Sequence, residues 1–137
     1  MLMDELPENW TYPLIQPKLI EKYLRVKNNS IIGATVTVTV DRPLGSYHPE
    51  YKNMYYPINY GYIEGVMAPD GEEQDAYILG VNESVGKFTG KIIAIVHRKD
   101  DVEEKWVVVP DGMMFSKDEI RQQIYFQEQY FDSEIVM

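Results

Sequence analysis

The sequence predicts a mainly β, α+β domain: a small closed barrel of five short strands with flanking helices near the N- and C-termini. Short runs rich in β-branched residues recur along the chain, turn-forming residues separate them, and helical patterns are confined to the two ends. With 137 residues, of which 45% are apolar, the chain has enough material for one core. We therefore expect a single domain, residues 1–137.

The strand signals are strongest at residues 31–40, where valine and threonine alternate between Thr35 and Val40. That period of two, with branched side chains on both faces, is typical of a strand. Turn-forming residues such as Asp70-Gly71 separate the later candidates. Four further strands are predicted at residues 59–66, 76–81, 87–97 and 105–109.

Helices are predicted at both ends of the chain. Residues 1–15 suggest an irregular arm, after which Pro17 opens a short helix that runs to about residue 25. Near the C-terminus, Ser116 and Glu119 have the spacing of a capping box, which begins a helix. A mostly apolar stripe follows at helical spacing, formed by Ile120, Ile124, Gln127 and Phe131.

Composition excludes several functions. The absence of cysteine rules out a disulfide framework, a thiolate zinc site and a cysteine nucleophile. Neither a signal peptide nor a membrane helix is indicated, so we expect a cytoplasmic protein with no membrane partner. The net charge of −9 disfavours nucleic acid as a partner. An acidic protein can still bind a phosphate compound if divalent cations lie between its carboxylates and the anion.

Two acidic clusters are candidate metal sites. Asp70, Glu72 and Asp75 fall in a turn that enters a strand, where carboxylates could converge on a hard cation such as Mg²⁺. A solvated acidic turn explains the same pattern and, judged alone, is the commoner case. Residues 100–104 form a second acidic run, which by itself is typical of an exposed hairpin loop.

Tyrosines are concentrated between Tyr47 and Tyr62. Such a row could line a pocket and donate hydrogen bonds to phosphate oxygens, or could pack as amphipathic rings on a barrel rim. His48 and His97 lack the spacing of metal ligands, and both are interpreted as structural.

The order of these motifs resembles that of soluble, family I inorganic pyrophosphatases. The match is strongest at Tyr56–Ile63, followed by Asp70–Asp75, which stands where the family has D-G-D-P-x-D. Glu103–Pro110 resembles the family segment in which a carboxylate precedes a lysine by two residues and a strand ends in Val-Pro. Asp41–Ser46 and Tyr130-Phe131 resemble the family's E-I-P-x-G-S and its helix-terminal Tyr-Lys.

This resemblance implies an OB-type five-stranded barrel that hydrolyses pyrophosphate with several Mg²⁺ ions, or another divalent ion such as Mn²⁺, and commonly forms a homo-oligomer. The implied metal ligands are Asp70, Asp75, Asp100 and Glu103. The implied catalytic residues are Glu72, as general base, and Lys105, which stabilises the leaving group. The implied substrate contacts are Arg42, Tyr60, Lys105 and Tyr130.

The chain also departs from the family pattern. Glu72 replaces an aspartate, Pro49 stands near an expected lysine, and Phe131 replaces the terminal lysine. A hairpin that carries a phosphate-binding arginine is missing, since ten positions separate Ser46 from Tyr56. Arg42, His48 or Lys52 could substitute for it. Two alternatives therefore stay open: a phosphohydrolase for another phosphoanhydride such as a nucleotide, and a non-catalytic relative that binds metal or phosphate.

Overall fold

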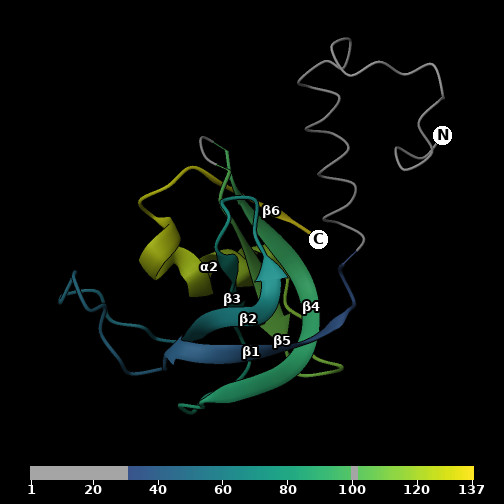
Figure 1. Cartoon of the computed structure of the whole chain (residues 1–137), viewed down its shortest axis with the longest axis horizontal. Coiled ribbons are helices and arrows are strands. Elements are labelled where there is room, and N and C mark those ends of the chain that lie inside the picture. Colours follow the sequence, from purple (N-terminus) through teal and green to yellow (C-terminus); the bar gives the residue numbers. More distant parts are fainter. Residues whose placement is uncertain (1–30, 100–101) are drawn as a thin grey trace, which may run out of the picture. The chain divides into compact units, whose positions relative to one another are not determined.

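The computed structural model describes residues 31–99 and 102–137, so the arm and helix predicted for residues 1–30 lie outside the described residues. Six strands and one helix make up the described part (Figure 1). The strands are β1 (Thr35–Arg42), β2 (Asn59–Met67), β3 (Glu73–Ile78), β4 (Lys87–Arg98), β5 (Glu104–Val109) and β6 (Ser133–Val136). The helix, α2 (Lys117–Glu128), lies between β5 and β6 in sequence.

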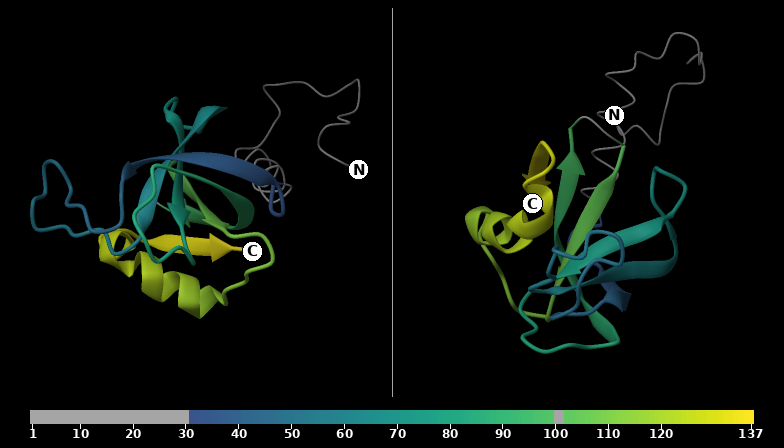
Figure 2. Two further views of the ribbon diagram at one scale, coloured as in Figure 1. Left: turned by 90° about the horizontal axis from the view of Figure 1, so that it is seen from below. Right: turned by 90° about the vertical axis from the view of Figure 1, so that its left-hand side faces the viewer.

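The first five strands form a closed barrel, which confirms the predicted fold class. Their order is β1-β2-β3-β5-β4, and β1 also pairs with β4 to close the ring. The β3–β5 pair is parallel, whereas the other pairs are antiparallel. Closure therefore gives each of these five strands a pairing partner on both sides. The two views of Figure 2 show α2 and β6 together on one side of this barrel.

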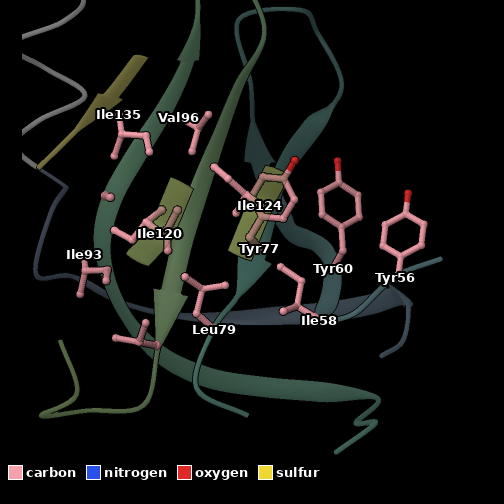
Figure 3. Close-up of a cluster of buried hydrophobic side chains, with 13 residues drawn as sticks. Tyr56, Ile58, Tyr60, Tyr77, Leu79, Ile93, Val96, Ile120, Ile124 and Ile135 are labelled. Atoms are coloured by element: carbon pink, nitrogen blue, oxygen red, sulfur yellow. The ribbon is translucent and has the colours of Figure 1, made fainter. Parts of the chain in front are cut away.

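Alternate residues of the barrel strands pack into two hydrophobic clusters, one inside the barrel and one between the barrel and α2. Ala76 and Ile78 of β3, for example, are fully buried and face the barrel interior. The residue between them, Tyr77, belongs to a second cluster with Ile120 and Ile124 of α2 (Figure 3). Side chains of a strand point alternately to its two faces, so the outer face of β3, β5 and β4 is the one that α2 covers.

The helix begins as the sequence predicts. The Ser116 side chain accepts a hydrogen bond from the Glu119 amide, and the Glu119 side chain accepts one from the Ser116 amide. Ile120, Ile124 and Gln127 are buried as expected, but α2 ends at Glu128. Phe131 therefore lies in the connection to β6 and is exposed.

Strand boundaries differ from the expected ones for identifiable reasons. β1 begins at Thr35 because residues 31–33 form a turn, in which Gly33 has a φ of 95°. β3 begins at Glu73, which pairs with Met67 beyond an irregularity in β2. β6 was not predicted, since its four residues carry too short a pattern; it pairs with the outer edge of β4.

Candidate active site

Strand register brings an acid and a base together on the outer face of the barrel. In the parallel pair β3–β5, Asp75 stands beside Lys105, two residues before the buried Tyr77. In the neighbouring pair β2–β3, Tyr60 stands beside Tyr77. Paired residues project from the same face of a sheet, so all four side chains emerge on the face that α2 covers. The predicted catalytic lysine and one predicted metal ligand are therefore neighbours.

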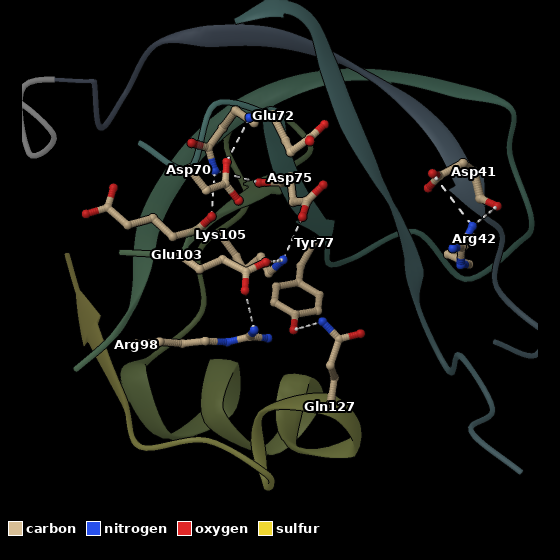
Figure 4. Close-up of polar contacts among 12 residues, drawn as sticks. Asp41, Arg42, Asp70, Glu72, Asp75, Tyr77, Arg98, Glu103, Lys105 and Gln127 are labelled. Carbon is tan, nitrogen blue, oxygen red and sulfur yellow. Dashed lines mark hydrogen bonds and ion pairs between the residues drawn. The ribbon is translucent and has the colours of Figure 1, made fainter. Parts of the chain in front are cut away.

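Lys105 is the centre of this cluster. Its side chain is only 3% exposed, and its Nζ donates to Asp75 Oδ2 at 2.6 Å and also to Glu103 Oε1 (Figure 4). The Tyr60 ring lies 5.5 Å from the same nitrogen, within the range of a cation–π contact. The fold thus places a buried ammonium between two carboxylates, at a defined point of the barrel's outer face.

Arg98, at the end of β4, extends this cluster toward α2. Its Nη1 donates to Glu103 Oε2 at 2.7 Å, and its Nε and Nη2 donate to the two oxygens of Glu128 at 3.2 and 2.8 Å. The Phe131 ring centroid lies 3.5 Å from the guanidinium carbon. Burial alone would lower the pKa of Arg98, but the hydrogen bonds and charge of Glu128, with the charge of Glu103, raise it above its usual value.

A chain of buried polar groups continues from Glu128. Tyr77 donates to Glu128 Oε2 at 2.5 Å and accepts from Gln127 Nε2 at 2.9 Å, and Tyr56 donates to Gln127 Oε1 at 3.1 Å. Burial raises the pKa of Tyr77 well above its usual value, as does the neighbouring Glu128 carboxylate. Burial and the Asp75 carboxylate do the same for Tyr60. These phenols therefore stay protonated at neutral pH and act as hydrogen-bond donors.

The predicted metal ligand Asp70 and general base Glu72 lie in the turn between β2 and β3, and both are exposed. The turn stabilises itself: the Glu72 amide donates to Asp70 Oδ1 at 3.0 Å, and Gly71 has a φ of 87°. Figure 4 shows these two side chains on the same side of the barrel as Asp75. Among the ion pairs of the described residues, Lys105 pairs with Asp75 but with neither Asp70 nor Glu72.

A β-bulge in β1 orients Arg42. Val40 pairs with Gly61 but Arg42 pairs with Tyr60, so Asp41 is the extra residue. The shift places Arg42 on the same face as Tyr60, where a regular strand would have placed it on the opposite one. Arg42 forms a 3.7 Å ion pair with Asp41, and Figure 4 shows this pair apart from the acidic cluster. Burial raises the pKa of Asp41, although the Arg42 charge opposes the shift.

Comparison with known proteins identifies the fold and the family. The family model described as "Pyrophosphatase: Inorganic pyrophosphatase" matches residues 26–128. The chain belongs to the inorganic pyrophosphatase family. An inorganic pyrophosphatase of Halalkalibacterium halodurans is 28% identical over 106 residues. That alignment covers 70% of this chain and 61% of the relative, so the match spans less than two thirds of the relative's length.

Solved structures of this family share the fold. An inorganic pyrophosphatase from Ehrlichia chaffeensis superposes with a TM-score of 0.58 at 19% identity, over 75% of this chain and 85% of that one. The enzyme from Neisseria gonorrhoeae gives 0.55 at 18% identity, over 72% and 74% of the two chains. These similarities support the OB-type barrel of the family, and the matched region contains the whole Asp75, Lys105 and Glu103 cluster.

The carboxylate oxygens of this cluster are of the kind that a hard divalent cation such as Mg²⁺ binds, because Mg²⁺ is commonly held by one or two carboxylates plus waters and phosphates. Asp75 and Glu103, both bonded to Lys105, supply two such carboxylates. Among the described residues, however, no three acidic or histidine side chains are grouped as a metal site. The described side chains thus fit an ion that two carboxylates share with substrate. Asp100, a fourth expected ligand, lies outside the described residues.

The remaining sequence-based candidates are dispersed. Tyr130 follows α2 and is 67% exposed. His48 Nδ1 accepts from the Glu50 and Tyr51 amides at 3.0 and 3.1 Å, so it stabilises a turn. No helix in the described part of the chain is long and apolar enough to cross a membrane.

Sequence reasoning missed Arg98 and Glu128. Their positions in the sequence could have revealed them. Arg98 lies on the same face of β4 as the buried Ala94 and Val96, and Glu128 follows the buried Ile124 by one helical turn. A charged residue at a position that the periodicity assigns to the buried face indicates an ion pair within the fold.

Proposed function

We propose that this protein hydrolyses inorganic pyrophosphate to two phosphates in a Mg²⁺-dependent reaction. The observation that carries the proposal is the Asp75, Lys105 and Glu103 cluster, placed by strand register in a barrel of the inorganic pyrophosphatase family. A bound Mg²⁺ would supply positive charge to the phosphate oxygens and lower the pKa of the attacking water. Asp75 and Glu103 would hold that ion, assisted by Asp70 and by Asp100.

Side chains of the protein supply proton transfer, stabilisation of the leaving group and contacts with the substrate. Glu72, exposed at the β2–β3 turn, takes a proton from the attacking water as a new P–O bond forms. Lys105 stabilises the negative charge on the departing phosphate as the bridging P–O bond breaks. Tyr60 donates from a protonated phenol to a phosphate oxygen, and Arg42 and Tyr130 approach the substrate from outside the cluster.

The first experiment measures phosphate release from pyrophosphate with and without Mg²⁺. Wild-type protein should release phosphate only when the metal is present. Asp75→Asn should reduce the rate at least ~10²-fold, because it removes the carboxylate charge that Lys105 and the metal ion both contact. Asp118→Asn is the matched control, since Asp118 is an exposed acid on α2 that pairs with Arg121. Metal-dependent release that survives Asp75→Asn would contradict the site assignment.

A second candidate is hydrolysis of another phosphoanhydride, such as that of a nucleotide. The segment between β1 and β2, residues 43–58, is held by a bridge between Tyr47 and Tyr55, both of which are exposed. Those rings could stack on a nucleotide base. Nucleoside triphosphates tested beside pyrophosphate decide between the two substrates. Metal binding without turnover of either substrate would favour the non-catalytic alternative.

The cytoplasmic location and the homo-oligomer stay predictions that accompany this proposal. Sedimentation velocity of the full-length protein measures the oligomeric state directly, and a monomer at micromolar concentration would contradict that expectation.

A further inference from the structure

Arg98 stands out because it is a buried arginine that contacts an expected metal ligand. Its side chain is 4% exposed, whereas a charged side chain is almost never so buried unless it is paired. It is paired on two sides, with Glu103 and with Glu128, and stacked on a third by Phe131. A guanidinium that donates from all three of its nitrogens to two carboxylates is held in one position.

This position matters for metal binding. The two oxygens of Glu103 are both occupied, one by Arg98 Nη1 and the other by Lys105 Nζ. A divalent cation that binds Glu103 must therefore displace one of these donors or share an oxygen with it. Asp75 also hydrogen-bonds the Tyr60 hydroxyl, but its one cationic partner among the ion pairs of the described residues is Lys105. The two carboxylates thus differ in how readily a metal can bind them.

The anchoring of Arg98 makes it the harder donor to displace. Glu128 binds it through two nitrogens and is itself held by Ser133 Oγ at 2.6 Å and by Tyr77. Lys105 has a flexible stem and a single ammonium, so it can move between Asp75 and Glu103 at lower cost than the planar guanidinium can leave two carboxylates.

We propose that Arg98 is a positioning residue that competes with divalent metal for Glu103 and supplies, as a built-in cation, part of the positive charge that a metal would bring. Through Glu128 it anchors Glu103 to α2. This inference rests on the metal-ligand role of Glu103 in the proposed function. It implies that the protein holds its metal more weakly than the same carboxylates would without Arg98.

The test is isothermal titration of the full-length protein with Mn²⁺, which reads metal binding without any turnover. Arg98→Met alone would leave Glu128 buried and unpaired, so the informative variant is Arg98→Met combined with Glu128→Gln. We expect its dissociation constant for Mn²⁺ to fall about tenfold, because one Glu103 oxygen is released from a charge-assisted bond. Adding Glu103→Gln should remove that gain.

Two variants separate contact from charge. Lys99→Met removes a nearby exposed cation that pairs with Asp132 and has no bond to Glu103, and it should leave the Mn²⁺ affinity unchanged. Arg98→Lys keeps the charge but cannot bridge both carboxylates, and it should tighten Mn²⁺ binding about threefold. It also serves if thermal melting shows that the double variant does not fold.

Unchanged Mn²⁺ affinity in the Arg98 variants, or an equal gain in Lys99→Met, would overturn the inference. Phosphate release by the wild-type protein is measured separately. If pyrophosphate is not hydrolysed yet the Arg98 variants bind Mn²⁺ more tightly, the proposed function fails while this inference stands; hydrolysis with unchanged Mn²⁺ affinity gives the reverse result.

Discussion

The candidate site has two halves that differ in how the fold holds them. One half lies on or beside the barrel strands: Asp75, Arg98, Glu103 and Lys105 are joined by ion pairs, and the two cations are buried. The other half lies in turns and connections: Asp70, Glu72 and Tyr130 are exposed, and their contacts are local.

This difference shows which half the fold organises in advance. Strand register fixes Asp75 against Lys105 before any ligand arrives, since the backbone pairing cannot shift by one residue without turning the side chains inward. The turn residues have no such constraint from strand pairing, since the contacts that hold them are local. We therefore expect substitutions in the strand half to affect stability and activity together, and those in the turn half to affect activity alone.

The largest expected effect is that of Lys105→Met. It removes the charge that stabilises the leaving phosphate and leaves Asp75 and Glu103 facing each other without their shared cation. We expect phosphate release to fall about 10³-fold and the free energy of unfolding to fall by about 1–3 kcal/mol. Phosphate release and urea unfolding measure the two losses. A catalytic loss with unchanged stability would break the comparison.

Glu128→Gln tests the strand half through stability and pH. Burial alone would raise the pKa of Glu128, but hydrogen bonds from Arg98, Ser133 and Tyr77 outweigh it and lower the pKa below 4.5. A lowered pKa in the folded state stabilises the protein above about pH 4.5, and the gain disappears as pH falls through the folded pKa. Glu128→Gln should therefore lose about 3 kcal/mol at pH 7.

The measurement is urea unfolding of both proteins between pH 7 and pH 3. The difference between wild type and variant should shrink as pH falls below about 4.5, because the Glu128 carboxyl of the unfolded wild-type chain then takes up a proton that the folded protein binds only at lower pH. Asp118→Asn, which changes an exposed acid on α2 that pairs with Arg121, is the companion variant for a charge change away from Glu128. A difference that is constant with pH would rule out the ionised Glu128 as the stabilising group.

Glu72 tests the turn half. If Glu72 is the general base, Glu72→Ala should reduce phosphate release about 10²-fold while the melting temperature stays within about 2 °C, since the side chain is exposed. Glu72→Asp should keep much more of the activity than alanine does. Glu73→Gln is the matched control, because Glu73 is an exposed acid beside Glu72. Its carboxylate accepts from the Gly65 amide at 3.0 Å, a bond that the glutamine oxygen can also accept. Equal activity of alanine and wild-type proteins would remove Glu72 from the mechanism.

The barrel strands were predicted well from the sequence, because runs of β-branched residues and the turn residues between them mark strands locally. Four of the five expected barrel strands overlap the observed ones along most of their length; the third, expected at 76–81, begins earlier, at Glu73. β6 escaped prediction because four residues gain their strand conformation from pairing with β4, which no local pattern records.

The site could be predicted only in part from the sequence. Asp75, Glu103 and Lys105 were named through family resemblance, and the structure joins them. The contacts of Arg98 and Glu128 depend on how α2 and β6 meet the end of β4, which is a non-local property. Likewise, the bulge at Asp41 that orients Arg42 is visible only once β1 is paired with β2.

The smallest expected effect is that of Tyr130→Phe. Tyr130 is exposed beyond the end of α2, and its only proposed role is one hydrogen bond to a phosphate oxygen. Losing it should raise the KM for pyrophosphate about threefold to tenfold, with kcat and the melting temperature nearly unchanged. Tyr125→Phe changes another exposed tyrosine, on α2, and as the matched control it should alter neither KM nor stability. If Tyr130→Phe instead destabilised the protein as Glu128→Gln does, the division between the strand half and the turn half would not extend past the end of the helix.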